Sequence, residues 1–196
     1  MRRNALSYKT DEELARLALQ DEAALYELFQ RYEAKLLRYL KRLLNVSHET
    51  CEDLLQEVFI KVYRNLNSFD SKLKFSSWIY RITRNEAISH YRKYKKNMQE
   101  LSLEDGTNDY LALLKDDTDL RKELEAKELG ELVHKTLLRL PRKYREVLIL
   151  KYLEEKDYQE MSGILKKPVG TIGTLLNRAK RAFKNELNNK LVSGVS

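Results

Sequence analysis

The sequence predicts an all-α protein with two helical domains, and three features of its 196 residues lead to that prediction. Only 6 Gly and 2 Pro interrupt a chain rich in Leu, Lys and Glu, a composition that favours helices with short connections. Apolar residues recur at intervals of three and four through most of the chain, which is the period of a helix with one buried face. Two basic blocks flank an acidic segment, a pattern typical of two domains joined by a linker.

The distribution of charge sets the expected domain boundaries. Residues 1–98 contain 19 Lys and Arg against 13 Asp and Glu, residues 99–128 contain 4 against 10, and residues 129–196 contain 14 against 7. Their net charges, basic minus acidic, are therefore +6, −6 and +7. We expect an N-terminal domain over 1–98, an acidic linker over 99–128 and a C-terminal domain over 129–196. The overall charge of +7 favours an anionic partner without identifying it.

The N-terminal block is expected to be a bundle of three or four helices joined by short loops. Thr10 to Glu13 has the form of a capping box, with acidic residues in the first helical turn. A long amphipathic helix is predicted over about 21–44. Its apolar face comprises Leu25, Leu28, Phe29, Tyr32, Leu36, Leu40 and Leu43.

The stretch EDLLQEVFIKVYRNL at 52–66 predicts a helix with two different faces, capped by Thr50 or Ser47. Its apolar face comprises Leu54, Leu55, Val58, Phe59, Val62, Tyr63 and Leu66. At ~100° per residue, Ile60 falls on the opposite, charged face. A lone exposed isoleucine is common on protein surfaces, but one set among charged side chains also resembles the apolar anchor of an interface with a polar rim.

Residues 68–72 are predicted to form a loop, and the next helix is expected over about 76–96. Aromatic and basic side chains alternate along this helix: Trp78, Tyr80, Arg81, Arg84, Tyr91, Arg92, Lys93, Tyr94, Lys95 and Lys96. Aromatic rings stack on unpaired bases while Arg and Lys neutralise phosphates, so the pattern favours nucleic acid. The alternative is that Trp78 and most of the tyrosines pack in the core.

The C-terminal block predicts a helix-turn-helix. A first helix begins at Pro141, which is tolerated in an opening turn, and its apolar face comprises Tyr144, Val147, Leu148 and Tyr152. Asp157 and Glu160 form a capping-box-like start for a short helix that ends near Leu165. Pro168 marks the start of a longer, basic helix after a tight turn. Short helix, tight turn and basic helix form the layout of a DNA-binding helix-turn-helix.

The last helix of this motif has a buried face and a face suited to DNA. Val169, Ile172, Leu176, Ala179 and Phe183 repeat at helical spacing and are expected to face inward. Asn and Arg side chains on the other face can pair with base edges, while small and hydroxyl residues at its start let the backbone approach a groove. An ordinary amphipathic helix with a solvated basic face is the alternative interpretation.

The chain has no motif that predicts catalysis or a cofactor. His48 and Cys51 are three residues apart, but three His and one Cys in all do not provide the spacing of a zinc site. Phosphate-binding glycine loops and nucleophile elbows are absent from the sequence. A single Cys excludes an internal disulfide and fits a reducing cytosol, and no apolar run is long enough to cross a bilayer.

Two segments together resemble a known family. EDLLQEVFIKVYRNLNSFD, followed by Phe75, Trp78, Ile82 and Asn85, resembles region 2 of sigma factors of the extracytoplasmic-function type. LLRLPRKYREVLILKYLEEKDYQEMSGIL with PVGTIGTLLNRAKRAF resembles region 4 of the same family. The two segments cover most of the chain. They follow one another in the order of the family's regions 2 and 4, and the segment between them has the length expected for the family. It implies that 1–98 is region 2, that 129–196 is region 4, and that both are helical.

The resemblance also implies roles for particular residues. The clamp coiled coil of the largest RNA polymerase subunit would be bound by Asp53, Gln56, Glu57, Ile60, Lys61 and Arg64. The promoter −10 element would be contacted by Phe69, Lys72, Lys74, Phe75, Ser76, Trp78, Arg81, Arg84, Asn85 and Ser89. The −35 element would be read in the major groove by Gly170, Thr171, Thr174, Asn177, Arg178, Lys180 and Arg181.

Several positions depart from the family pattern. The family usually has Gly at the turn of the helix-turn-helix, whereas this chain has Lys166 or Lys167, so a non-Gly residue with positive φ is expected there. Gly173 and Leu175 stand where the family's recognition helix usually carries cations. We therefore expect an altered affinity and sequence preference for the −35 element. Cys51 replaces the family's Ala, without an expected effect on function.

The preferred hypothesis is a transcription initiation factor that binds RNA polymerase core, recognises the −10 and −35 elements and promotes DNA melting. The expected partners are the clamp coiled coil and flap of the polymerase, promoter DNA, and an anti-sigma factor that could hold the protein at the membrane. A cytoplasmic location is expected, without a small-molecule substrate or a cofactor. The main alternative is a free-standing helix-turn-helix regulator, and a more distant one is an enzyme that acts on nucleic acid.

Overall fold

The computed structural model describes residues 6–70, 73–98 and 120–193, and within them the chain forms helices and no strand. The elements are α2 (Asp11–Leu17), α3 (Glu22–Leu43), α4 (His48–Asn65), the 3₁₀ turn η1 (Leu66–Ser68), α5 (Phe75–Met98), α6 (Leu120–Arg139), α7 (Arg142–Leu148), the π-helical turn η3 (Ile149–Leu153), α8 (Tyr158–Leu165) and α9 (Val169–Ser193). The predicted all-α class is confirmed.

Side-chain caps explain where several helices begin. Both predicted capping boxes are present: Thr10 and Glu13 exchange hydrogen bonds at the start of α2, and Asp157 and Glu160 do so at the start of α8. The Ser47 hydroxyl accepts from the Thr50 backbone N–H, so α4 starts at His48, and of the two predicted caps Ser47 is the one the structure has. The predicted helices over 21–44 and 76–96 match α3 and α5 to within two residues at each end.

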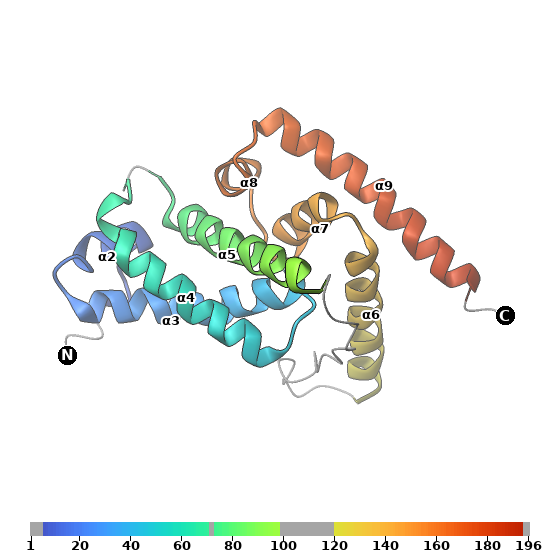
Figure 1. Ribbon diagram of the computed structural model, residues 1–196, viewed down its shortest axis with the longest axis horizontal. Coiled ribbons are helices and arrows are strands. Elements are labelled where there is room, and N and C mark those ends of the chain that lie inside the picture. The colour runs from blue at the N-terminus through green and yellow to red at the C-terminus, as the bar shows by residue number, and fades with distance from the viewer. Residues whose placement is uncertain (1–5, 71–72, 99–119, 194–196) are drawn as a thin grey trace.

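Helices α3, α4 and α5 form the first bundle, with α2 packed against α3 and α5 (Figure 1). The predicted apolar faces supply most of its core. Tyr39, which the sequence did not assign to the core, is fully buried, with its ring 5.1 Å from that of Tyr80. Phe29 and Phe59 stack at 4.2 Å between α3 and α4. The lone cysteine, Cys51, is buried in the same core.

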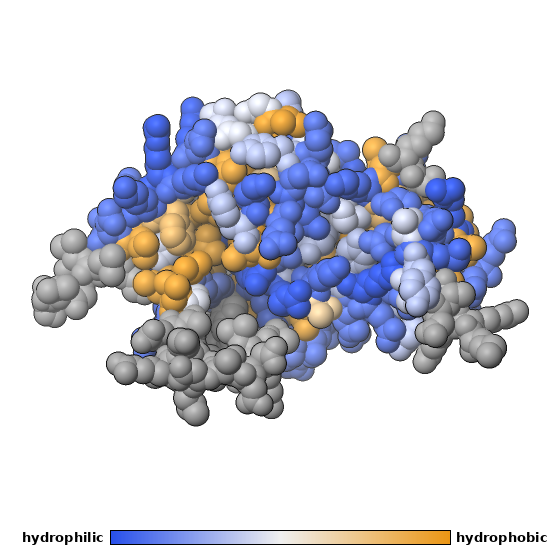
Figure 2. Space-filling view, turned by 180° about the vertical axis from the view of Figure 1, so that it is seen from behind, coloured by the Kyte–Doolittle hydropathy of each residue, from blue (hydrophilic) through white to orange (hydrophobic). Residues whose placement is uncertain are grey.

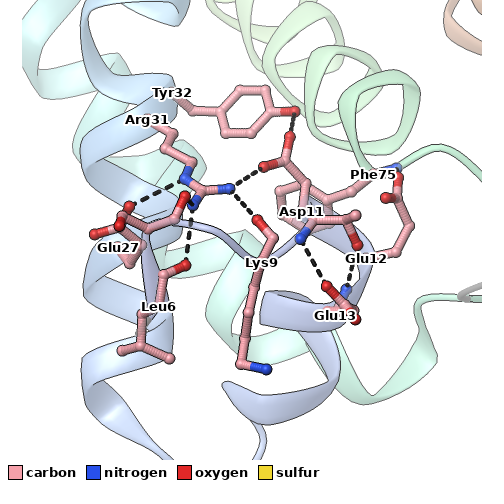
Figure 3. Close-up of polar contacts among 11 residues, drawn as sticks. Leu6, Lys9, Asp11, Glu12, Glu13, Glu27, Arg31, Tyr32 and Phe75 are labelled. Carbon is pink, nitrogen blue, oxygen red and sulfur yellow. Dashed lines mark hydrogen bonds and ion pairs between the residues drawn. The ribbon is translucent and has the colours of Figure 1, made fainter. Parts of the chain in front are cut away.

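Arg31 on α3 fastens the N-terminal segment to the bundle (Figure 3). Its guanidinium, at 2.8–3.1 Å, donates to the backbone carbonyls of Leu6, Ser7 and Lys9 and to the carboxylates of Asp11 and Glu27. On the other side of α2, the Glu12 carboxylate accepts from the Phe75 backbone N–H at 2.8 Å. That N–H opens α5 and has no partner inside the helix, so α2 links the start of α5 to α3.

Replacing Arg31 with Met is expected to lower the free energy of unfolding by about 2 kcal/mol, because charge-assisted hydrogen bonds to three carbonyls are lost. Hydrogen exchange of the α2 amides should accelerate at the same time. The matched control is Arg16→Met at an exposed arginine of α2, which should change neither measurement. Unchanged exchange in Arg31→Met would contradict the role of this clamp.

The second half of the described chain is built around α9, against which α6, α7 and α8 pack. Arg145 on α7 binds the C-terminal ends of two helices. It donates to the carbonyls of Leu137, Leu138 and Leu140 at the end of α6, and to that of Leu43 at the end of α3. Such terminal carbonyls have no partner within their own helix, so one guanidinium caps α6 and connects the two halves.

The two halves lie side by side, with α8 against α5 and η3 against α3 (Figure 1). Residues 99–119 of the predicted acidic linker lie outside the described residues. Residues 120–128, the rest of that predicted linker, belong to α6. Seen from behind, the surface is mainly hydrophilic, with an apolar area at the end of the molecule that carries α6 and α9 (Figure 2).

Candidate functional site

The outer face of α4 presents the side chains that the sequence assigned to a protein partner. Every member of the predicted set is exposed: Asp53, Gln56, Glu57, Ile60, Lys61 and Arg64. Ile60 is 49% exposed, so the apolar residue at the centre of the charged face is available for contact. Lys61 differs from the others because its ammonium lies 2.5 Å from the carboxylate of Glu86 on α5, which is itself buried.

Tyr63 corrects one prediction about this helix. The sequence placed it on the buried face, yet its side chain is 64% exposed. Phe59 occupies the contact with α3 through its stack on Phe29, and Tyr63 lies at the edge of the apolar arc, where no core element covers it. Because Tyr63 follows Ile60 by three positions, the two share one side of α4. The exposure of Tyr63 could have been predicted from this spacing, because Ile60 was already expected on the exposed face.

An aromatic cluster occupies the segment between α4 and α5. The ring centroids of Phe69, Phe75 and Trp78 lie 5.3–5.6 Å apart in all three pairs. Phe75 is fully buried and Trp78 is 8% exposed, so in this conformation neither side chain is accessible to a DNA strand. The resemblance had assigned both of them to contacts with the −10 element. Their size and hydrophobicity explain the burial. Lys72, which belongs to the same predicted set, lies outside the described residues.

The remaining predicted −10 residues separate into two groups along α5. Lys74, Ser76 and Arg84 bond to acidic side chains of α7 and α8. Asn85 and Ser89 are exposed and Arg81 is half-buried. These three follow one another at intervals of four residues, so they form one line along the helix.

The outer face of α9 is fully formed. Ile172, Leu176 and Ala179 are buried, as predicted. All seven residues of the predicted −35 set are exposed: Gly170, Thr171, Thr174, Asn177, Arg178, Lys180 and Arg181. The Thr174 hydroxyl donates to the Gly170 carbonyl at 3.1 Å within the helix. Lys166 has φ 53° and ψ 50°, which confirms the expected left-handed residue at the turn before α9.

The contact between Tyr152 and Lys180 was not predicted from the sequence. Tyr152 was assigned to a buried face but is 52% exposed, and the Lys180 ammonium lies 5.5 Å from its ring centroid. The hydrogen bond with Tyr152 raises the pKa of Lys180 above its ordinary value. An aromatic ring under a lysine holds its charge in place. The π-helical turn that carries Tyr152 could not be read from apolar spacing, because its period differs from 3.6.

Burial raises the pKa of the Cys51 thiol to about 11, so it is neither a thiolate ligand nor a nucleophile at neutral pH. Within the described part of the chain, His, Cys, Asp and Glu side chains form no group of three that could hold a metal ion. None of its helices combines the length and hydropathy that crossing a lipid bilayer requires.

Gly173→Ala is expected to raise the free energy of unfolding by up to about 1 kcal/mol, because Ala has the higher helix propensity. A Cβ at this position would lie 3.8 Å from Cε1 of Tyr158, an ordinary contact that requires no movement. Urea unfolding measures the effect. Gly130→Ala on α6, where a Cβ would meet nothing within 4 Å, is the matched comparison and should give a similar gain. A loss of stability in Gly173→Ala alone would contradict the observed spacing.

Two family models match the chain. Sigma-70 region 2 matches residues 28–97, and Sigma-70 region 4 matches residues 130–183. Among curated proteins, the chain is 35% identical to the "ECF RNA polymerase sigma factor SigW" of Bacillus subtilis, over 85% of this chain and 90% of that protein. It is 31% identical to the "ECF RNA polymerase sigma-E factor" of Haemophilus influenzae, over 91% and 95% of the two chains.

Two solved structures have a similar fold. The structure of CnrH in complex with the cytosolic domain of CnrY matches with a TM-score of 0.67 and 20% identity, over 92% of this chain and 99% of that one. The sigma factor RpoE in complex with the anti-sigma factor NepR from Bartonella quintana matches with a TM-score of 0.66 and 22% identity, over 82% and 94%. At these identities the likeness concerns the fold.

Proposed function

The chain belongs to the extracytoplasmic-function sigma factors of the sigma-70 family, which are transcription initiation factors, and on that basis we propose which of its surfaces carry out initiation. The observation that carries the proposal is that each matched region presents an exposed surface with suitable chemistry. Region 2 presents an apolar anchor in a charged rim on α4, and region 4 presents Asn, Arg and hydroxyl groups on α9.

The outer face of α4 docks on the clamp coiled coil of RNA polymerase core. Ile60 and Tyr63 supply the apolar contact, and the charged side chains around them supply orientation and exclude water. Tyr63 joins the predicted set because it is exposed beside Ile60. The ammonium of Lys61 is paired with Glu86, so Lys61 mainly links α4 to α5 and contributes less to the contact with the clamp. The flap of the polymerase is the proposed partner of the C-terminal domain.

The outer face of α9 reads the −35 element in the major groove. Asn177 can bond both N6 and N7 of an adenine, and Arg178 can bond both O6 and N7 of a guanine, each pair discriminating by about 1–3 kcal/mol. Lys180, held by Tyr152, meets the phosphate backbone and sets the register. Gly173 brings no charge to this face, so fewer phosphates are neutralised and the salt dependence of binding should be correspondingly shallow.

The outer line of α5 contacts the −10 element after the duplex opens. Arg81, Asn85 and Ser89 offer donors along one side of the helix. Phe75 and Trp78 take a supporting role, because their burial against Phe69 holds the segment before α5 in shape. Trapping unpaired bases offsets an unstacking cost of a few kcal/mol, which is how binding promotes melting.

The proposed domains are 1–98 and 129–196, joined by the acidic segment 99–128, of which 120–128 are helical. We place the protein in the cytoplasm, where polymerase core works, without a catalytic site. An anti-sigma factor is a further proposed partner. One structure of similar fold holds a sigma factor in complex with an anti-sigma factor, and another holds CnrH in complex with the cytosolic domain of CnrY.

One experiment tests the proposed function against the helix-turn-helix regulator. The purified protein is added to core RNA polymerase on a library of random-sequence duplex templates, and the 5′ ends of the transcripts are sequenced. We expect start sites that share −10 and −35 sequences and appear only when the protein is present. Tight, specific binding to duplex DNA by the protein alone, without association with core, would refute the proposal and support the regulator.

A further inference from the structure

The ring of Tyr158, the first residue of α8, lies beside α9 at Gly173. A Cβ placed on Gly173 would lie 3.8 Å from Cε1 of Tyr158, which is an ordinary contact between the two helices. Tyr158 is nevertheless 39% exposed. Gly173 has no side chain that could bind a ligand, so at this point of α9 the neighbouring ring supplies accessible side-chain atoms instead.

Tyr152 repeats this arrangement two turns further along the same side of α9. Gly173 and Lys180 are seven positions apart, which is about two helical turns, and Asn177 lies between them on the same side. The Lys180 ammonium lies 5.5 Å from the centroid of the Tyr152 ring. The pKa of Lys180 is raised mainly by its hydrogen bond with Tyr152 and further by its electrostatic interaction with Tyr158, so both rings lie near this ammonium.

A second lysine is placed over a ring in the same way. The ammonium of Lys151, in the π-helical turn η3, lies 5.4 Å from the centroid of the Tyr158 ring. A ring that attracts an ammonium restricts the rotamers of the lysine before a ligand arrives, so less side-chain freedom is lost on binding. We call the following four residues, which lie along this side of α9, the tyrosine edge: Lys151, Tyr152, Tyr158 and Lys180.

The opposite side of the outer face of α9 has different chemistry. Leu175, Ala182 and Glu186 lie there at intervals of seven and four residues. Leu175 and Ala182 are half-buried and pack against the core. A helix in the major groove lies between two backbone strands. The strand on this side would meet apolar groups and a carboxylate, whereas the strand on the other side would meet two ammonium groups and two phenols.

The carboxylates next to the tyrosine edge are engaged by other groups. Asp157, which precedes Tyr158, accepts from the Glu160 backbone N–H at 2.8 Å and from Lys74 Nζ at 3.0 Å. The Glu160 carboxylate accepts from the Asp157 backbone N–H at 3.0 Å and from the Ser76 hydroxyl at 2.9 Å. These contacts offset part of the negative charge beside Tyr158, so the two lysines dominate the potential along the edge.

We propose that the tyrosine edge holds the phosphate backbone of one strand of the −35 duplex, with the Tyr158 hydroxyl in place of the side chain that Gly173 lacks. The inference rests on the proposed function, because it takes α9 as the helix in the major groove. The Tyr158 hydroxyl donates to a phosphate oxygen, and Lys151 and Lys180 neutralise neighbouring phosphates. The edge then sets the affinity for duplex DNA, while Asn177 and the other base-reading residues set the sequence preference.

The salt dependence of duplex binding tests the charged part of the edge. The full chain is titrated into a fluorescein-labelled duplex of mixed sequence, and anisotropy gives its affinity between about 50 and 200 mM salt. Each neutralised phosphate contributes about 0.9 to the slope of log affinity against log salt, so Lys151→Met should make the slope shallower by about 0.9. Arg16→Met removes the same charge from α2 and should leave the slope almost unchanged. Equal slopes for Lys151→Met and wild type would overturn the inference.

The hydroxyl is tested separately with Tyr158→Phe, which removes one oxygen atom and keeps the ring. We expect this variant to bind the same duplex about fivefold more weakly with an unchanged slope, because the lost group carries no charge. Tyr26→Phe, at an exposed tyrosine of α3, is the control and should bind as wild type does. Urea unfolding checks that both variants are folded. Wild-type affinity in Tyr158→Phe would remove the basis of the proposal.

A rescue experiment tests whether Tyr158 stands in for a side chain at Gly173. Gly173→Arg, added to Tyr158→Phe, should restore at least wild-type affinity and steepen the slope by about 0.9. Gly130→Arg adds the same charge on α6, where a Cβ meets nothing within 4 Å, and should not restore the affinity. Equal rescue by the two arginines would mean that only the total charge matters, which contradicts a contact specific to this edge.

Transcription with core polymerase separates this inference from the proposed function. On a promoter recovered from the random library and on versions with single changes in the −35 element, Tyr158→Phe should lower initiation by about the same factor throughout. Asn177→Ala should instead lower it mainly on the original sequence. A changed order of preference in Tyr158→Phe would show that Tyr158 reads bases, against the inference. If wild type ignores the −35 sequence, the proposed function fails, and the salt slopes and the rescue still decide whether the edge binds phosphate.

Discussion

Ile60→Glu is expected to lower the affinity for core RNA polymerase by at least about tenfold, equivalent to about 1.4 kcal/mol. Ile60 is the aliphatic residue at the centre of the charged outer face of α4 and is 49% exposed. In a complex its side chain would be desolvated, and a carboxylate in its place would lose its hydration without a partner. Binding of labelled protein to core, followed by anisotropy, measures the change.

The fold should survive this substitution, because Ile60 makes no part of the bundle core. Circular dichroism and urea unfolding check that the variant is intact. Leu19→Glu is the matched control: Leu19 is a similarly exposed aliphatic residue, 54% exposed, in the turn between α2 and α3. It should bind core as wild type does. Equal affinities for Ile60→Glu and wild type would show that α4 docks through another face.

Acidification from pH 7 to pH 4 is expected to lower folding stability through His134, by less than about 3 kcal/mol because solvent screens the partly exposed ring. Burial lowers the pKa of His134 to about 4, and the nearby guanidiniums of Arg145 and Arg42 add to the effect. In the unfolded chain the imidazole has its ordinary pKa of about 6.5. Below pH 6.5 the imidazole of His134 therefore binds a proton in the unfolded state but not in the folded state. The free energy of unfolding falls until the pH reaches about 4.

The comparison with His134→Gln isolates this contribution, because carboxylates titrate over part of the same range. Urea unfolding at steps between pH 7 and pH 4 should show a smaller loss of stability in the variant than in wild type. The difference should appear mainly between pH 6.5 and 4 and level off below it. Identical pH profiles for the two proteins would mean that His134 titrates normally in the folded state.

Local sequence was enough to predict the helices and their ends. The two capping boxes, at Thr10 and Asp157, form through contacts within four residues, so no distant part of the chain is needed to place them. The left-handed conformation of Lys166 was instead expected from the resemblance, because the family usually has Gly at this turn. The exposed face of α9 could be predicted from the helical spacing of its apolar residues alone, because the buried ones lie on one side of the helix.

Residues at the edges of the apolar faces could not be assigned in this way. Tyr63 and Tyr152 satisfy helical spacing but are exposed, while Tyr39 is fully buried outside the predicted apolar set. Which tyrosine is covered depends on the helix that packs over it. For Trp78 the sequence left two interpretations open, and its burial follows from the positions of Phe69 and Phe75.

The sequence by itself determined the all-α fold class, the order of the helices and the chemistry of the α9 face, because each rests on local propensity, periodicity and capping. Only the tertiary structure decided which charges meet. Arg84 and Glu146 are separated by 62 positions, and Lys74 and Asp157 by 83. No periodicity relates residues so far apart, and their pairing depends on how two polar surfaces dock, which is why a basic helix read as a DNA-binding surface is closed by carboxylates of its own chain.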